Sequence, residues 1–121
     1  MNSTSGSNIS DYNTPLQICP LDVQKRLESD EPTVIIDCRT QQERVICSIS
    51  GSHHIPLHEL EHRMEELNND MHSMLVVHCH HGVRSLQAAE LLRANGFDHA
   101  CSMIGGISRW ADLIDSSIPK Y

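Results

Sequence analysis

A cysteine and an arginine joined by a short glycine-containing loop are the residues of this chain best suited to covalent chemistry. They lie in the segment His78-Cys79-His80-His81-Gly82-Val83-Arg84-Ser85. Cysteine attacks as its thiolate, and the guanidinium of Arg84 offers a fixed charge and paired N–H donors to an oxyanion such as thiosulfate or phosphate. Gly82 allows the backbone freedom that a loop needs to turn its amides toward one point. The segment therefore predicts a nucleophilic thiol, Cys79, beside an anion-binding loop.

The charge around this segment differs from that of the rest of the chain. The 121 residues carry a net charge of −7, yet residues 71–89 contain no Asp or Glu and hold Arg84 and four histidines. This local balance favours an anionic substrate, because reactive thiols occur in electropositive surroundings. The acidic chain as a whole argues against nucleic acid and anionic membrane surfaces as partners. No apolar run approaches the roughly 20 residues that span a bilayer, so we expect no membrane segment.

The position of Cys79 in the chain indicates the edge of a sheet. Two apolar runs, residues 33–36 and 74–77, have the length and largely the β-branched content of strands buried on both faces. Apolar residues with helical spacing occur in three further segments, at residues 57–67, 86–92 and 107–114. Alternating strands and helices predict an α/β domain, in which ligands bind beyond the carboxyl ends of the strands. Cys79 follows such a strand almost directly.

Proline, glycine and composition predict the remaining boundaries. Pro20 favours the first turn of a helix, and Gly96 favours the end of another. Residues 100–104 are expected to form a short strand. Residues 1–14, rich in Ser, Asn and Thr, are expected to be a disordered leader without the features of a secretory signal, and residues 15–121 a single domain.

The five cysteines are an odd number without a Cys-x-x-Cys pair, which favours neither a disulfide framework nor a zinc site. A reducing cytoplasm fits this cysteine usage best. We expect Cys38, Cys47 and Cys101 to be buried or half-exposed thiols, and either Cys38 or Cys47 remains open as a resolving thiol for an oxidised Cys79.

The order of several short motifs resembles that of the rhodanese-like domain family, over about residues 16–115. These motifs are Asp37-Cys38-Arg39 with Glu43, Gly51-x-x-x-Ile55-Pro56-Leu57, Cys79-x-x-Gly82-x-Arg84-Ser85, Ala88-Ala89-x-x-Leu92, Gly96-Phe97 and Gly105-Gly106-Ile107-x-x-Trp110. The C-terminal pattern from Trp110 to Tyr121 is similar to the rhodanese domains fused behind ubiquitin-like-activating enzymes in sulfur-carrier pathways.

The resemblance implies a doubly wound α/β domain with a five-stranded, mainly parallel sheet and helices on both faces. It also implies a sulfurtransferase without a cofactor, in which Cys79 takes a sulfane sulfur from thiosulfate or a persulfide donor. Cys79 would hold that sulfur as a persulfide and release it to a thiophilic acceptor, and a protein sulfur acceptor is implied as a partner. The substrate-binding residues would be those of the loop, whose amides cradle the charge: His80, His81, Gly82, Val83, Arg84 and Ser85. Asp37 and Arg39 would support that loop.

Two other functions stay open for the same residues. His78-Cys79 with a downstream Arg-Ser resembles the loop of cysteine-dependent phosphatases, but Cys79 and Arg84 are separated by four residues where those enzymes have five. The shorter loop makes a narrower cradle, which favours a single sulfur over a phosphate with three oxygens. A non-enzymatic sulfur carrier or regulatory module is the other alternative, and the intact Cys79 argues against an inert form.

The nine histidines predict no metal site, because consecutive side chains such as those of residues 78–81 cannot converge on one ion. The histidine pairs at residues 53–54 and at residues 58 and 62 are expected to face solvent. Because imidazole titrates near pH ~6.5, we expect thiosulfate turnover to depend on charged His80 and His81 and to fall between about pH 6 and 8.

Overall fold

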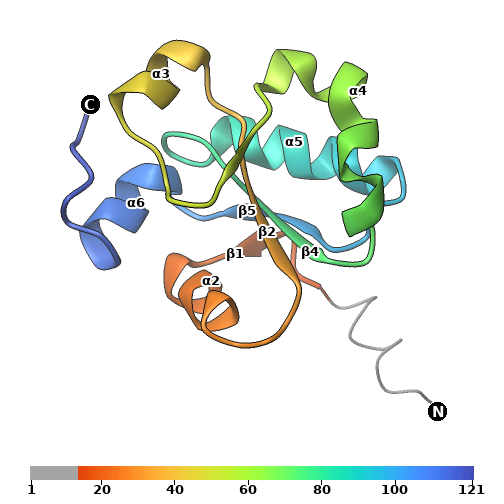
Figure 1. The fold of residues 1–121 in the computed structure, drawn as a ribbon, viewed down its shortest axis with the longest axis horizontal. Helices are drawn as coiled ribbons and strands as arrows, with labels where there is room; N and C mark the ends of the chain where they lie inside the picture. Colours follow the sequence, from red (N-terminus) through yellow and green to blue (C-terminus); the bar gives the residue numbers. More distant parts are fainter. Residues whose placement is uncertain (1–13) are drawn as a thin grey trace.

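Two apolar segments form the centre of the sheet in the computed structural model, which describes residues 14–121. Strands β2 (Thr33–Asp37) and β4 (Met74–His78) pair in parallel from end to end, and Asp37 lies opposite His78 at their carboxyl ends. The sheet has the order β1-β5-β4-β2-β3 and is completed by the parallel strands β1 (Gln17–Ile18), β5 (Ala100–Met103) and β3 (His53–His54) (Figure 1). The predicted five-stranded parallel α/β fold is confirmed.

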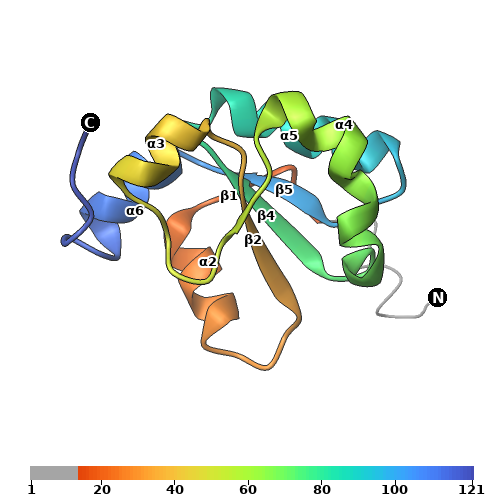
Figure 2. The same ribbon diagram turned by 45° about the horizontal axis from the view of Figure 1, so that its top comes forward.

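Helices cover both faces of this sheet, as the turned view shows (Figure 2). One face carries α2 (Pro20–Leu27) and α6 (Gly106–Leu113), and the other carries α4 (Leu60–Arg63) and α5 (Val83–Ala94). Ile35 and Val76 belong to the buried cluster under α2 and α6, while Ile36 and Val77 belong to the cluster under α4 and α5. Successive strand residues alternate between faces, so burial on both sides explains the continuous apolar runs.

Helix ends follow the predicted signals closely. Pro20 is the first residue of α2, and Cys19 precedes it without a side-chain capping hydrogen bond. Helix α5 ends at Ala94, two residues before Gly96, which adopts a left-handed φ of 96°. The predicted strand at residues 100–104 is one residue longer than β5.

Helix α3 (Gln41–Ile46) was not predicted, although its start has a sequence signal. The Thr40 hydroxyl accepts from the Glu43 amide at 3.2 Å, and the Glu43 carboxylate accepts from the Thr40 amide at 3.1 Å. This reciprocal capping box is readable as Thr-x-x-Glu. None of the α3 residues is fully buried, so the helix lacks the apolar stripe by which a helix is recognised in a sequence.

The helix predicted over residues 57–67 is wrong as a continuous helix. The chain there forms η1 (Leu57–Glu59), the single turn α4 and η2 (Met64–Asp70), which are tighter 3₁₀ turns around one α-helical turn. Asn68, Asn69 and Asp70 end the segment, and such side chains compete with backbone hydrogen bonds of a regular helix. Packing requires only that Leu60 and Leu67 reach the core, and both are buried.

The disordered leader predicted for residues 1–14 lies, except for its last residue, outside the described residues. The Thr14 hydroxyl lies 2.7 Å from Nδ1 of His99. Within residues 14–121, no helix combines the length and apolar character that crossing a membrane requires.

Candidate active site

The sulfur of Cys79 lies one residue beyond the carboxyl end of β4, inside a turn that leads into α5. The amides of Gly82 and Ser85 donate to Sγ over 3.0 and 3.4 Å, and the Ser85 Oγ lies 3.4 Å from the same sulfur. Gly82 has a φ of 110°, a left-handed conformation that disfavours side chains with a Cβ. The turn therefore aims N–H groups at the thiol, as a helix N-terminus does at an anion.

A second thiol contacts Cys79 from the neighbouring strand. The side chain of Cys38, the residue after β2, hydrogen-bonds Cys79, and this contact is the largest of the effects that lower the pKa of Cys79. Burial opposes it, while hydrogen bonds from Ser85 and Gly82 add to it, and the pKa of Cys79 falls to about 4. The same contact raises the pKa of Cys38. Cys79 is therefore the thiolate of the pair, and Cys38 keeps its proton.

Helix α6 is hydrogen-bonded to the turn that contains Cys79. The amide of Ile107 donates to the carbonyl of Cys79 over 2.9 Å, and the amide of Ser108 donates to the carbonyl of His80 over 3.2 Å. A Cβ on Gly106 would collide with the carbonyl oxygens of Cys79 and His80. The backbones meet so closely that only glycine fits at position 106.

A buried ion pair occupies the end of β2. Asp37 accepts from Arg39 Nε at 2.9 Å and from Nη2 at 2.8 Å, and both side chains are fully buried. Burial alone would raise the pKa of Asp37, but the hydrogen bonds from Arg39 lower it to about 2. Arg44 of α3 adds a third contact to the carboxylate, and Arg39 Nη2 donates to the Cys47 carbonyl over 2.6 Å. These bonds tie β2 to α3.

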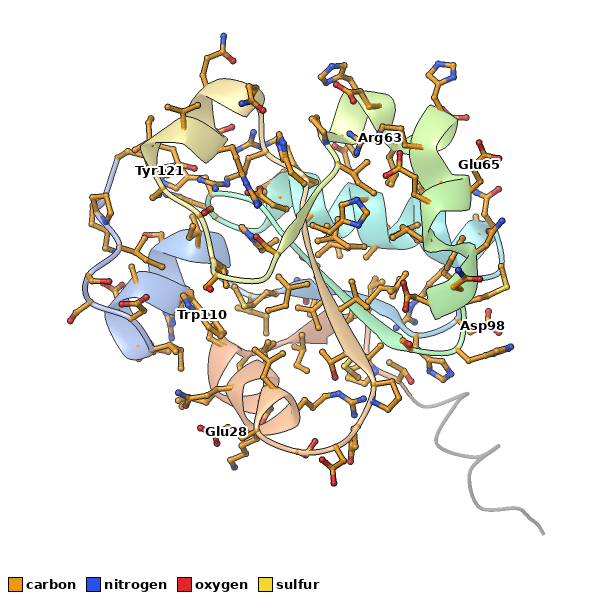
Figure 3. The ribbon with its side chains drawn as sticks, in the orientation of Figure 1. Glu28, Arg63, Glu65, Asp98, Trp110 and Tyr121 are labelled. Carbon is orange, nitrogen blue, oxygen red and sulfur yellow. The ribbon has the colours of Figure 1, made fainter. Side chains whose placement is uncertain are left out.

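Arg84 is engaged by a carboxylate in this structure. Its two terminal nitrogens donate to Glu43 of α3 over 2.6 and 2.9 Å, and this bidentate bond is the largest effect that lowers the pKa of Glu43 and raises that of Arg84. The Tyr121 hydroxyl also donates to Glu43, over 2.7 Å, and accepts from Arg39 Nη1 at 3.0 Å. Tyr121 lies beside α3 (Figure 3). Residues from three distant parts of the chain thus meet at Glu43.

The histidines of the loop differ in environment. His80 stacks on Tyr121 with ring centroids 4.0 Å apart, and burial together with the neighbouring His81 lowers its pKa. His81 is exposed. His78 is fully buried, its Nε2 has no hydrogen-bond partner among the described residues, and burial lowers its pKa to about 4. A neutral His78 adds no charge beside the thiolate.

A cavity of about 340 Å³ opens next to Cys38. Its lining residues are Cys38, Thr40, Pro56, Leu57, His58 and Arg84. Cys79 is only 1% exposed and does not line this cavity. Cys38, which contacts Cys79, is one of the lining residues. The thiolate therefore faces the donating amides at the inner end of the site, and a reactant arriving through the cavity meets Cys38 and Arg84 first.

The structure brings some of the predicted site residues together and separates others. Cys79, Gly82 and Ser85 converge on the sulfur, whereas the Val83 side chain is 76% exposed. The sequence predicted that the amides of residues 80–85 cradle the sulfur. Within the described residues, two of these six amides, those of Gly82 and Ser85, donate to Sγ. The expectation for the histidine pairs holds for residues 58 and 62, which are exposed, but is wrong for His54, whose Nε2 lies 2.8 Å from the Arg39 carbonyl oxygen.

Three contacts of the site, those of Glu43, Tyr121 and Cys38, were not predicted from the sequence. The motifs include Glu43 without giving it a role, and Tyr121 enters only through a C-terminal pattern. Cys38 is expected as a possible resolving thiol, without its contact to Cys79. The capping signal at Thr40 could have placed Glu43 on a helix near β2, while nothing local indicates what the Tyr121 side chain contacts. No group of three or more potential metal ligands occurs within residues 14–121.

The comparison with known families agrees with this arrangement. The sequence model of the rhodanese-like domain family matches residues 20–113. The chain belongs to this family. Among solved structures, the rhodanese-like domain protein of Staphylococcus aureus superposes with a TM-score of 0.71 at 29% identity, covering 83% of this chain and 95% of that one.

Several relatives of this rhodanese-like chain are named as sulfurtransferases. The adenylyltransferase and sulfurtransferase MOCS3-2 of Zea mays is 39% identical over 103 residues, which cover 80% of this chain and 21% of the maize protein. The thiosulfate sulfurtransferase GlpE of Ectopseudomonas mendocina is 35% identical over 77 residues, covering 64% of this chain and 69% of that protein. This chain thus spans about a fifth of the length of its maize relative.

Proposed function

We propose that this rhodanese-like chain is a sulfurtransferase that carries a sulfane sulfur on Cys79. The observation that carries the proposal is the contact of Sγ with the Gly82 and Ser85 amides, together with a pKa of about 4. Such a thiol is a thiolate at neutral pH without a general base. The amides also stabilise the negative charge that a persulfide places in the same turn.

The transfer has two balanced steps. The Cys79 thiolate attacks the outer sulfur of thiosulfate, the sulfur–sulfur bond of thiosulfate breaks, and sulfite leaves with the electron pair. Cys79 then holds the persulfide anion. A nucleophile such as cyanide or a thiolate attacks the outer sulfur, and the Cys79 thiolate leaves. The name of the thiosulfate sulfurtransferase relative supports thiosulfate as one donor, and a persulfide donor would react by the same bond exchange.

Arg84 would orient the donor by exchanging the Glu43 carboxylate for the oxyanion of thiosulfate. It lines the cavity through which a donor reaches the thiol pair, and it is the first-turn residue of α5. His80 and His81 would add charge only when protonated. Because the pKa of His80 is lowered, its contribution lies at lower pH than the window of about pH 6 to 8 expected from free imidazole.

A protein acceptor is supported by the surface around Arg84 and Glu43. Val83, which precedes Arg84, and Val45, two residues after Glu43, are 76% and 75% exposed. Apolar side chains beside a charged entrance suit a protein partner better than a small anion.

All five cysteines are free, which supports a reducing compartment such as the cytoplasm.

A thiosulfate and cyanide assay tests the proposal. We expect thiocyanate formation by the wild type and none by Cys79→Ser, and we expect the tryptic peptide 64–84 to gain the mass of one sulfur atom after thiosulfate treatment. That gain should disappear on addition of a thiol. Cys19→Ser is the matched control, because serine is a better helix cap than cysteine at the start of α2 and should leave activity unchanged.

An aryl phosphate assay with the same three proteins separates the alternatives. Phosphate release that depends on Cys79 without any thiocyanate would assign the site to a phosphatase. If the peptide gains sulfur but the protein transfers that sulfur neither to a thiol nor to cyanide, the chain would be a non-enzymatic sulfur carrier. Absence of loading and of both activities would leave an inert module.

A further inference from the structure

Cys38 and Cys79 have the geometry of a pair that can be joined. We propose that they form a reversible disulfide when a peroxide oxidises Cys79, so that the candidate active site also contains a peroxide-sensitive switch. This inference goes beyond sulfur transfer and does not depend on the sulfur donor.

The backbone places the two residues side by side. Asp37 pairs with His78 in the parallel register of β2 and β4, so the next residues, Cys38 and Cys79, are again neighbours. The Cys38 amide donates to the His78 carbonyl over 3.0 Å, which shows that the pairing continues past the strand ends. Adjacent strands lie about 4.8 Å apart, within the range of about 4.4–6.8 Å between the Cα atoms of a disulfide.

The two side chains also lie on the same face of the sheet. Cys38 and Cys79 belong to one buried cluster, and their thiols are hydrogen-bonded. The other cysteines are placed differently. Cys101 belongs to the cluster on the opposite face and Cys47 packs against that cluster, while the Cys19 thiol donates to Asp22 at the start of α2. Cys38 is therefore the cysteine positioned to react with an oxidised Cys79.

The reaction balances with a peroxide as the oxidant. The Cys79 thiolate attacks one oxygen of hydrogen peroxide, the oxygen–oxygen bond breaks, and hydroxide leaves, which gives a sulfenic acid. Cys38 then attacks Sγ of Cys79, the sulfur–oxygen bond breaks, and the proton of Cys38 departs with the oxygen as water. The two thiols supply two electrons, and a dithiol reductant restores them by exchange.

The electrostatics of the pair favour this order of events. The hydrogen bond with Cys79, burial and the thiolate charge on Cys79 all raise the pKa of Cys38 and keep it protonated while Cys79 is reduced. Conversion of Cys79 to a neutral sulfenic acid removes that charge, so Cys38 becomes more acidic when a nucleophile is needed. The disulfide would also protect Cys79 from the irreversible sulfinic acid.

Peptide mapping after peroxide treatment tests the proposal without an activity assay. Trypsin cleaves after Arg26, Arg39, Arg63 and Arg84, so Cys38 and Cys79 fall in separate peptides, residues 27–39 and 64–84, free of the other cysteines. We expect these two peptides to be joined in wild type and in the Cys19→Ser control. In Cys38→Ser and Cys38→Ala, we expect Cys79 to gain two oxygen atoms and to stay modified after dithiothreitol.

The recovered reactivity of Cys79 toward iodoacetamide gives a second readout. After treatment with peroxide and then dithiothreitol, the wild type should recover most of its Cys79 labelling. The Cys38 variants should recover less than a tenth of theirs. Wild type that yields oxygenated Cys79 without the joined peptides would overturn the proposal, whether or not the variants fold. Thiocyanate formation is measured separately, so a chain without sulfurtransferase activity can still form the disulfide.

Discussion

The turns that follow β4 and β2 are neighbours at the carboxyl edge of the sheet, yet they stabilise an anion in different ways. After β4, the Cys79 thiolate is held by backbone amides, a hydroxyl and a thiol, all of them uncharged. After β2, the Asp37 carboxylate is held by the guanidinium groups of Arg39 and Arg44. Neutral donors lower a pKa without neutralising the nucleophile, whereas a buried ion pair fixes geometry and leaves the carboxylate fully engaged.

Removal of the charge after β2 should have the largest effect on the molecule. In Asp37→Asn, Arg39 stays buried without its carboxylate, and breaking such a pair costs about 3–5 kcal/mol. We expect that loss in the free energy of unfolding by urea at neutral pH. Asp98→Asn is the control, since Asp98 is exposed and lies on the side of the molecule away from α3 (Figure 3), and it should stay within about 0.5 kcal/mol.

The same pair predicts the direction of the pH dependence. The folded pKa of Asp37 is about 2, below the ordinary carboxyl value of about 4. Its contribution is therefore complete above about pH 4 and is lost as the pH falls toward 2. The stability difference between wild type and Asp37→Asn should shrink over that range. A difference that stays constant down to about pH 2 would contradict an ionised Asp37.

Displacement of the turn after β4 is the next largest change. Gly106→Ala would place a Cβ against the His80 carbonyl and would strain a residue with a φ of 61°. Left-handed strain costs about 1–2 kcal/mol and overpacking about 1–3 kcal/mol, so we expect a loss of about 2–5 kcal/mol. Cys79 should also react more slowly with iodoacetamide, because its amide donors move.

Gly96→Ala separates these two effects. Gly96 has a φ of 96°, but no atom lies within 4 Å of the point that a Cβ would occupy, so its variant carries the strain without the collision. It should lose stability while Cys79 keeps its reactivity. Equal loss of reactivity in both variants would show that α6 does not position the turn.

The thiol of Cys38 is the donor that connects the two turns, and its removal should raise the pKa of Cys79. A hydrogen bond to a charged group is worth about 1.5–3 kcal/mol, which corresponds to about one to two pH units. Wild-type Cys79 should be alkylated at a constant rate above about pH 6 and at a falling rate as the pH drops through about 4. In Cys38→Ala the fall should begin at higher pH. An unshifted profile would mean that the amides alone set the pKa.

The same contrast explains what the sequence could and could not predict. The turn after β4 was predicted because its determinants are consecutive: an apolar strand, Cys79, Gly82 and the start of a helix. Helix α3, which follows β2, has a remote partner, since Tyr121 reaches Glu43 from 78 positions away. The contact between Cys38 and Cys79 depends on the register of two strands, which their apolar pattern leaves undefined. The direction of Arg84 depends in turn on the unpredicted helix α3.

Release of Arg84 from Glu43 should have the smallest effect and the most specific one. Glu43→Gln keeps the capping box, because glutamine also accepts from the Thr40 amide, but it removes the charge that competes with an anionic donor. Partly exposed ion pairs are worth about 0–1 kcal/mol, so the KM for thiosulfate should fall by up to about fivefold with little change in kcat. Glu66→Gln removes the same charge from an ion pair with Arg63 and should leave KM unchanged. An equal fall in both variants would attribute the effect to net charge and would leave Arg84 without a role in donor binding.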